Sequence, residues 1–121
     1  MVTVLIVDDE KFLHEVLEQI LKLRGHIVID HAYNGLEAIE KYVSLKSKPD
    51  IILMDHRMPF MDGTSATREL KQLDPSVIVV VFSADDSVKD QAEDAGADGF
   101  LVKPISSSTL FEAIDAYLAS S

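Results

Sequence analysis

The sequence predicts an α/β fold made of five consecutive βα units, in which a parallel sheet is covered by helices on both faces. The main observation is that strand-like and helix-like periods of apolar residues alternate along the whole chain. A second observation is the β-branched run 77–82, which is apolar on both faces and is typical of a central parallel strand. A third is that charged side chains directly follow three of the apolar runs.

The first two units show both periods clearly. Residues 3–7 predict a buried strand, and the helix after them is predicted to end where Gly25 offers a C-cap. Residues 27–31 predict a weaker edge strand, followed by a helix for which Asn34 and Glu37 are a capping pair. The apolar residues expected to face inward are Phe12, Leu13, Val16, Leu17, Ile20 and Leu21 in the first helix, and Leu36, Ile39, Tyr42 and Val43 in the second.

The remaining units repeat the alternation. Asp74-Pro75 ends the third helix, because the residue before a proline disfavours helical backbone angles. That helix is expected to bury Ala66, Leu70 and Leu73. The predicted strands are 50–54, 77–82 and 99–102, and the predicted helices are 64–73, 86–95 and 107–119.

Length and composition limit the function. The chain has 121 residues, 47% of them hydrophobic, and no linker or repeat divides it, so one domain spanning residues 1–121 is predicted. A formal net charge of −10 argues against direct binding of nucleic acid or of an anionic membrane. The absence of cysteine fits the cytosol. The first apolar run is too short for a signal peptide, and the longest is too short to span a bilayer.

Three charged motifs at the ends of apolar runs predict a site. Asp8-Asp9, Asp55 and Lys103-Pro104 would meet at one edge of a parallel sheet if the runs are neighbouring strands. Two carboxylates about 4 Å apart repel by roughly 4 kcal/mol at an effective dielectric constant near 20. The acidic group therefore needs positive charge, which Lys103 and a divalent metal ion would supply.

The motifs also resemble a known family. They are Asp8-Asp9, the segment from Asp55 to Gly63 (DHRMPFMDG), Ser83-Ala84 and Lys103-Pro104. In this order they resemble the signature of the receiver domains of two-component response regulators, the chemotaxis-regulator-like superfamily. The resemblance covers residues 3 to about 119. It implies a doubly wound, flavodoxin-like three-layer sandwich with a parallel five-stranded sheet in the order 2-1-3-4-5.

The resemblance implies a nucleophile and a cofactor. Asp55 would be the phosphoacceptor, whose carboxylate attacks the phosphorus of a phosphohistidine in a partner. The implied cofactor is Mg²⁺ or Mn²⁺, which prefers oxygen ligands. Asp9 would be a direct ligand and Asp8 a water-mediated one, with Asp55 and the backbone carbonyl of Arg57 completing the protein's share.

Further roles follow from the same resemblance. Lys103 would clamp one phosphoryl oxygen electrostatically, and Ser83 would donate its hydroxyl to another. Phe100 occupies the position of an aromatic residue that turns inward after phosphorylation, with simple core filling as an equal alternative. Pro104 would have a structural role, because the family pattern makes the Lys103–Pro104 bond cis.

The implied function is a phosphorylation-dependent switch of a two-component or phosphorelay system. The protein would catalyse only its own phosphotransfer and autodephosphorylation, and would not be an enzyme acting on an external metabolite. Its partners would be a sensor histidine kinase or phosphotransfer protein and a downstream effector or output domain, with a possible homodimer through the face 86–118. A cytoplasmic location is expected. The chain ends soon after the last predicted helix, so it is expected to be either a stand-alone receiver or the front of a longer regulator.

Two other functions stay open. Phosphatases of the haloacid dehalogenase type also use a strand-end aspartate, but their Asp-x-Asp pattern has Arg57 at the second position here. A pseudo-receiver would bind partners without phosphorylation, although such domains usually lose an acid or the lysine.

The histidines and two charged residues near the predicted site carry smaller expectations. His14, His26 and His31 are expected to be solvated or to act as caps, and His56 to point away from Asp55. An ion pair between Arg57 and Asp85 across the mouth of the site is a further hypothesis.

Overall fold

The computed structural model describes residues 1–120 and shows the predicted alternation of strands and helices. Ser121, the last residue of the predicted domain, lies outside the described residues. No helix within residues 1–120 is long and apolar enough to cross a membrane. The elements are β1 (Thr3–Val7), α1 (Lys11–Lys22), β2 (Ile27–Ala32), α2 (Gly35–Ser44), β3 (Ile51–Asp55), α3 (Gly63–Leu73), β4 (Val79–Ser83), the short 3-10 helix η1 (Asp86–Val88), α4 (Lys89–Asp94), β5 (Gly99–Val102) and α5 (Ser107–Ser120).

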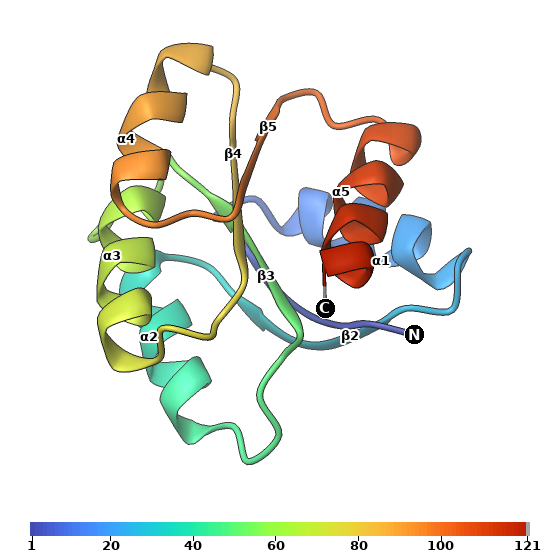
Figure 1. Ribbon diagram of the computed structural model, residues 1–121, viewed down its shortest axis with the longest axis horizontal. Helices are drawn as coiled ribbons and strands as arrows, with labels where there is room; N and C mark the ends of the chain where they lie inside the picture. The colour runs from blue at the N-terminus through green and yellow to red at the C-terminus, as the bar shows by residue number, and fades with distance from the viewer. Residues whose placement is uncertain (121) are drawn as a thin grey trace.

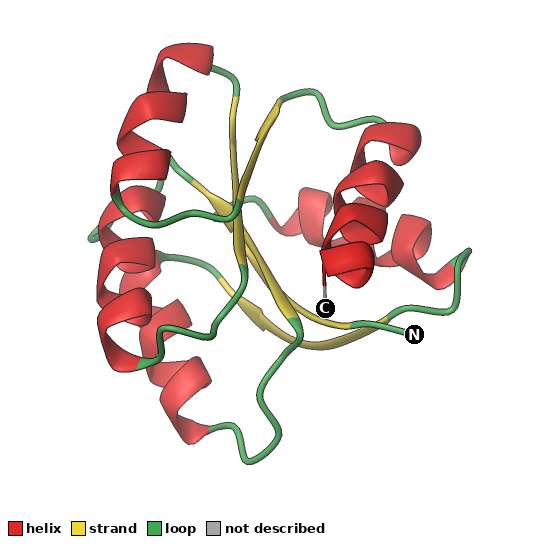
Figure 2. Ribbon diagram, in the orientation of Figure 1, coloured by secondary structure: helices red, strands yellow, loops and turns green. Residues whose placement is uncertain are grey.

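All strands are parallel and form one five-stranded sheet in the order β2-β1-β3-β4-β5. Helices α1 and α5 cover one face, and α2, α3 and α4 cover the other (Figure 1). The sheet therefore lies between two helical layers (Figure 2), which confirms the doubly wound, flavodoxin-like fold. The position of β2 at the edge of the sheet is confirmed as well.

The hydrophobic core has two halves because the central strands bury both of their faces. Every residue of β3 and β4 is buried. One half packs sheet residues such as Leu5 and Met54 against α2, α3 and α4. The other packs residues such as Ile6 and Phe82 against α1 and α5. Burial of a Leu or Ile side chain stabilises the fold by about 1.5–3 kcal/mol.

Four apolar residues predicted to face inward are exposed instead, because each helix buries only a narrow stripe. The buried stripe of α1 is His14, Leu17 and Leu21, and that of α2 contains Ala38 and Tyr42. The exposed residues are Phe12 (73%), Leu36 (46%), Val43 (61%) and Leu73 (59%).

The boundaries differ most from prediction in two places. The fourth strand begins at Val79, because Val77 N–H bonds the carbonyl of Asp74 in the turn before it. The predicted helix 86–95 divides into η1 and the six-residue α4, and its buried residues are Val88, Ala92 and Ala95.

The amino edge of the sheet is closed by side chains that accept hydrogen bonds from strand N–H groups. Thr3 N donates to Asp50 Oδ2 at 2.9 Å, and Val79 N donates to Asp98 Oδ2 at 2.9 Å. Val2 N donates to His26 Nδ1 at 3.1 Å. His26 is buried, so of the two roles expected for it, solvated or capping, the solvated one was wrong.

Candidate functional site

The carboxyl edge of the sheet gathers the charged residues that the sequence singled out. Asp8 follows β1, Asp55 ends β3, Ser83 ends β4 and Lys103 follows β5. One oxygen from each of Asp8, Asp9 and Asp55 lies within 4.8 Å of the others. Lys103 Nζ is 3.1 Å from Asp8 Oδ2 and 3.2 Å from Asp55 Oδ1. The lysine thus supplies the positive charge that the acidic group requires.

A cavity of about 460 Å³ opens over these residues. Its walls come from the ends of four strands and the loops after them, so groups far apart in sequence face one space. It is lined by Asp9, Glu10, Asp55, Arg57, Ser83, Ala84, Asp85 and Lys103. Phe100 and His56 are not among the lining residues.

Burial differs sharply among the acids. Asp8 is fully buried and Asp55 is 4% exposed, whereas Asp9 is exposed. Burial, followed by the neighbouring Asp8 carboxylate, raises the pKa of Asp55 to about 6. Burial alone would lower the pKa of Lys103, but the carboxylates of Asp55 and Asp8 outweigh it and the net shift is upward.

Local backbone bonds hold the acids in place. Asp8 Oδ1 accepts from Glu10 N at 2.8 Å, which fixes the turn into α1. The loop after Asp55 is closed by Gly63 N, which donates to the carbonyl of His56 at 2.8 Å. A Cβ atom on Gly63 would lie 2.0 Å from the Asp55 carbonyl oxygen, so only glycine allows this approach. Asp62 then caps α3 by accepting from Ser65 N.

The lysine loop is anchored on the neighbouring strand. Lys103 N donates to the carbonyl of Ser83 at 2.9 Å, and the Lys103–Pro104 bond is cis, as the resemblance implied. The Lys103 ammonium also lies 5.1 Å from the centre of the Phe82 ring. The ring face attracts the cation, which helps to hold the ammonium beside the acids.

Ser83 and Phe100 occupy different surroundings. Ser83 is buried, lines the cavity and accepts from Asp85 N through its hydroxyl oxygen at 3.1 Å. Phe100 is half-buried and packs against the core half beneath α2, α3 and α4. This packing agrees with the core-filling alternative for Phe100.

The hypothesis of an Arg57–Asp85 ion pair was wrong. Among the described residues these two side chains form no ion pair within 4.0 Å. The Asp85 carboxylate is engaged in its own loop, where it accepts from Ser87 N at 2.9 Å and from Ser87 Oγ at 2.7 Å. These bonds lower the pKa of Asp85 and cap η1.

Sequence reasoning missed His14. It was expected to be solvated or to act as a cap, but it is buried, and its Nε2 lies 2.8 Å from the carbonyl oxygen of Asp8. A signal was present, since His14, Leu17 and Leu21 follow the i, i+3, i+7 spacing of an inward-facing stripe.

The donor set fits a hard divalent cation. Asp8, Asp9 and Asp55 offer carboxylate oxygens only, and the cavity beside them has room for water molecules. Mg²⁺ prefers oxygen ligands and usually keeps several waters, so two or three protein oxygens at an open site suit it.

Comparisons with known proteins agree with this geometry. Residues 4–115 match the model of the response regulator receiver domain. The chemotaxis protein CheY of Thermotoga maritima is 42% identical over 93% of this chain and 93% of its own. The transcriptional regulatory protein PdtaR of Mycobacterium tuberculosis is 40% identical over 93% of this chain, but the match spans 54% of its own length. The structure of the CheX-CheY-BeF3-Mg complex from Borrelia burgdorferi superposes with a TM-score of 0.90 at 31% identity, covering 97% of this chain and 89% of that one.

Proposed function

The chain belongs to the family of response regulator receiver domains, and we propose that it is a phosphorylation-dependent switch with Asp55 as the phosphoacceptor. The observation that carries the proposal is the setting of Asp55. It is a buried carboxylate with a pKa of about 6, it ends β3 beside Lys103, and it lines an open cavity. A carboxylate that only capped a turn would need neither the lysine nor the acidic neighbours.

The cofactor we propose is Mg²⁺ or Mn²⁺. Asp8, Asp9, Asp55 and the backbone carbonyl of Arg57 would hold it, with Asp8 acting through water. When bound, such an ion supplies positive charge to the oxygens of a transferring phosphoryl group. The BeF3 and Mg named in the Borrelia complex support this proposal by likeness.

The nucleophilic step belongs to Asp55. Its carboxylate oxygen forms a bond to phosphorus while the bond from phosphorus to the donor's imidazole nitrogen breaks, and the imidazole leaves. The carboxylate must be ionised to attack. With a pKa of about 6, Asp55 is mostly ionised at neutral pH, and it is more basic than an ordinary aspartate.

Lys103 and Ser83 stabilise the transferred group. The Lys103 ammonium is already 3.2 Å from Asp55 Oδ1, so a small movement brings it to a phosphoryl oxygen. The Ser83 hydroxyl faces the same cavity and would donate to a second oxygen. Phosphorylation thereby exchanges carboxylate contacts for phosphoryl contacts at the ends of β4 and β5.

The proposed role in the cell is signalling. We propose a sensor histidine kinase or phosphotransfer protein as the phosphoryl donor and a downstream effector or output domain as the receiver of the signal. The protein would turn over no external metabolite. A homodimer through the face 86–118 remains part of the proposal, since η1 and α4 bury few side chains there.

Intact-mass measurement tests the proposal directly. The protein is incubated with Mg²⁺ and a small-molecule phosphodonor, and one added phosphoryl group is expected on the wild type and none on Asp55→Asn. Lys103→Ala is expected to bind Mg²⁺ at least as well as the wild type, because the competing ammonium is gone, but to lose the phosphorylated conformation seen by amide NMR shifts. An unmodified wild type would instead support the pseudo-receiver alternative.

A further inference from the structure

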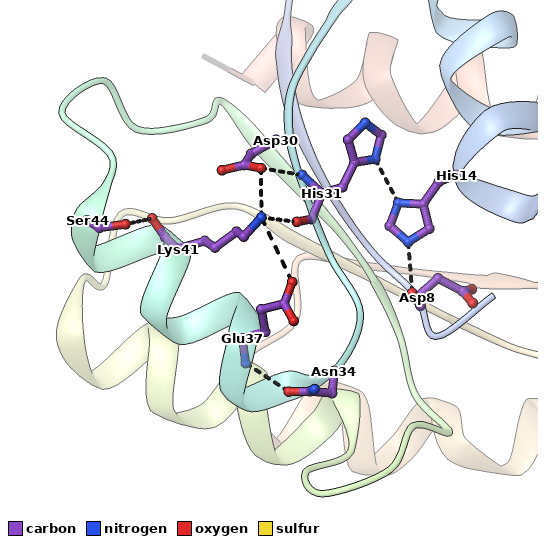
Figure 3. A network of polar contacts seen from close by, with 8 residues as sticks. All are labelled: Asp8, His14, Asp30, His31, Asn34, Glu37, Lys41 and Ser44. Atoms are coloured by element: carbon purple, nitrogen blue, oxygen red, sulfur yellow. Dashed lines mark hydrogen bonds and ion pairs between the residues drawn. The ribbon is translucent and has the colours of Figure 1, made fainter. Parts of the chain in front are cut away.

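A chain of polar contacts leads from the acidic site through buried His14 to the partly exposed His31 (Figure 3). His14 Nε2 lies 2.8 Å from the carbonyl oxygen of Asp8, and His14 Nδ1 lies 2.8 Å from His31 Nδ1. His31 Nε2 is 3.3 Å from Glu18 Oε1. None of these three side chains belongs to the motifs that carry the family resemblance, and none lines the cavity.

The acceptor at the Asp8 end fixes one hydrogen of the chain. A carbonyl oxygen can only accept, so His14 Nε2 carries a hydrogen and donates it to Asp8. The two Nδ1 atoms lie 2.8 Å apart, so one of them carries the hydrogen that joins the two rings. The other nitrogen of His31 faces the Glu18 carboxylate. The hydrogen on Nε2 of His14 is thus set by the Asp8 carbonyl.

The two rings are also held in place by packing and by the sheet edge. The His14 ring packs on Tyr33 with 4.5 Å between ring centres. The backbone of His31 is clamped by Lys41 on α2, whose Nζ donates to His31 O at 2.6 Å and to Asp30 Oδ1 at 3.0 Å (Figure 3). Asp30 in turn accepts from His31 N at 2.8 Å. The imidazole that reaches Asp8 is therefore part of a fixed framework.

The bond to Asp8 matters because of where that carbonyl lies. It belongs to the peptide that joins Asp8 to Asp9, beyond the end of β1 and before the first residue of α1. Asp8 N is already fixed on β2, where it donates to Ala32 O at 3.1 Å. Rotation of the Asp8–Asp9 peptide would move the Asp9 carboxylate relative to those of Asp8 and Asp55. His14 supplies the hydrogen bond that opposes this rotation.

We propose that His14 is a positioning residue of the cation site, which fixes the Asp8–Asp9 peptide and so the spacing of the carboxylates. The inference rests on the proposed function only in taking these carboxylates as the Mg²⁺ ligands. His14 touches neither the cation nor the phosphoryl group. Its effect passes through the backbone of Asp8, with His31 and Glu18 holding its ring.

The test compares Mg²⁺ affinity in His14→Leu and His14→Gln at fixed neutral pH, measured by calorimetry. Leucine fills the space without a donor, whereas glutamine can place an N–H group near the position of Nε2. Loss of a group that orients a metal ligand typically weakens metal affinity by about 10- to 100-fold. We expect a loss in this range for His14→Leu and recovery of most of the affinity in His14→Gln. Wild-type affinity in His14→Leu, or an equal loss in both variants, would overturn the proposal.

A matched control separates positioning from general destabilisation. His26 is also a buried histidine with a backbone hydrogen bond, but it lies at the opposite edge of the sheet. His26→Leu is expected to lower the free energy of unfolding without changing Mg²⁺ affinity. If it weakened Mg²⁺ binding as much as His14→Leu, the specific role of His14 would be disproved.

Imidazole ¹⁵N NMR of the wild type tests the underlying bond without any variant that could fail to fold. The expected spectrum shows hydrogen on Nε2 of His14, and hydrogen on Nδ1 alone would overturn the proposal. The outcome is independent of phosphorylation. Suppose that the wild type binds Mg²⁺ more tightly than His14→Leu but accepts no phosphoryl group. That result would refute the proposed function and leave this inference standing.

Discussion

The two edges of the sheet use the same residue type in opposite ways. At the amino edge, Asp50 and Asp98 accept hydrogen bonds from Thr3 N and Val79 N, so each carboxylate satisfies a strand end. At the carboxyl edge, Asp8 and Asp55 are buried close together beside a third acid, with Lys103 as their shared counterion. The first edge stabilises the fold, whereas the second keeps charge crowded in an apolar setting.

The contrast shows where the molecule accepts buried charge at a cost in stability. An aspartate that receives N–H donors adds to stability, whereas burial beside other carboxylates destabilises the ionised form. Burial, then the Asp8 carboxylate, raises the pKa of Asp55, which is the physical sign of that cost. Substitutions at the two edges should therefore change stability in opposite directions.

The largest effect is expected for Asp55→Asn in the absence of divalent cations. The pKa of Asp55 rises from 3.8 to about 6 on folding, so the folded state holds this proton more tightly than the unfolded chain. The stabilisation that comes from this bound proton is complete below 3.8, the pKa of the unfolded chain, and is lost as pH rises through about 6. A shift of this size corresponds to on the order of 3 kcal/mol.

Urea unfolding of the wild type and Asp55→Asn at pH values from acid to neutral measures this effect. The variant should be the more stable protein at neutral pH. The gain in the free energy of unfolding is at most the value given above, reduced by the stabilisation lost with the Lys103–Asp55 ion pair. The difference between the two proteins should shrink in acid. A less stable Asp55→Asn protein at neutral pH would contradict the contrast between the edges.

The second effect is the stabilisation of the wild type by Mg²⁺. A ligand at 100 times its dissociation constant stabilises the folded state by about 2.7 kcal/mol if it binds only that state. Thermal unfolding should therefore shift upward with added Mg²⁺, and Asp9→Asn should lose most of the shift. An unchanged shift in Asp9→Asn would remove Asp9 from the proposed ligands.

A somewhat smaller effect, of opposite sign to Asp55→Asn, is expected at the amino edge. Asp50→Ala leaves Thr3 N and Thr3 Oγ1 without their acceptor, and a hydrogen bond at such a part-buried position contributes about 0.5–1.5 kcal/mol. Asp50→Asn keeps an acceptor oxygen and serves as the matched control. Urea unfolding should rank the wild type above Asp50→Asn and Asp50→Ala last, and Mg²⁺ affinity should stay constant across the three.

The smallest effect concerns His26. Burial, then the nearby N-terminal amino group, lowers its pKa, and its Nδ1 must be unprotonated to accept from Val2 N. The stabilisation by neutral His26 is complete above the ordinary histidine pKa of 6.5. It is lost as pH falls below 6.5 and through the lower pKa of the folded state. His26→Asn can keep an acceptor without titrating. Its stability should fall less than that of the wild type between neutral and mildly acidic pH, and parallel curves would argue against the role of His26.

Much of the carboxyl edge could be predicted from sequence because its signals are local. Apolar runs that stop at Asp8, Asp55 and Lys103 mark strand ends, and in a parallel sheet these ends share one edge. The order of the strands came from the resemblance to a family. The buried stripes of the helices were predicted too broadly, because exposed apolar residues such as Phe12 fit the same period.

The network behind the site could not be predicted, because it depends on strand register. The pairing of β1 with β2 shifts between Val4 and Leu5, and beyond that shift His31 lies opposite Ile6. A shift of one residue turns a side chain to the other face of a sheet, and the sequence of residues 27–31 contains no signal that predicts this shift. The contact between His14 and His31 follows from this irregularity.

In the proposed switch, the segment formed by η1 and α4 sets the free energy that phosphorylation must supply. Its buried anchors are Val88, Ala92 and Ala95, and they contribute roughly 3–5 kcal/mol by the usual value for buried apolar groups. Reversing a two-state population from 1:99 to 99:1 takes about 5.5 kcal/mol. The free energy that holds this segment in place is thus of the same size as the free energy that reverses the population. A more firmly packed segment would not move on phosphorylation, and a less firmly packed one would move without it.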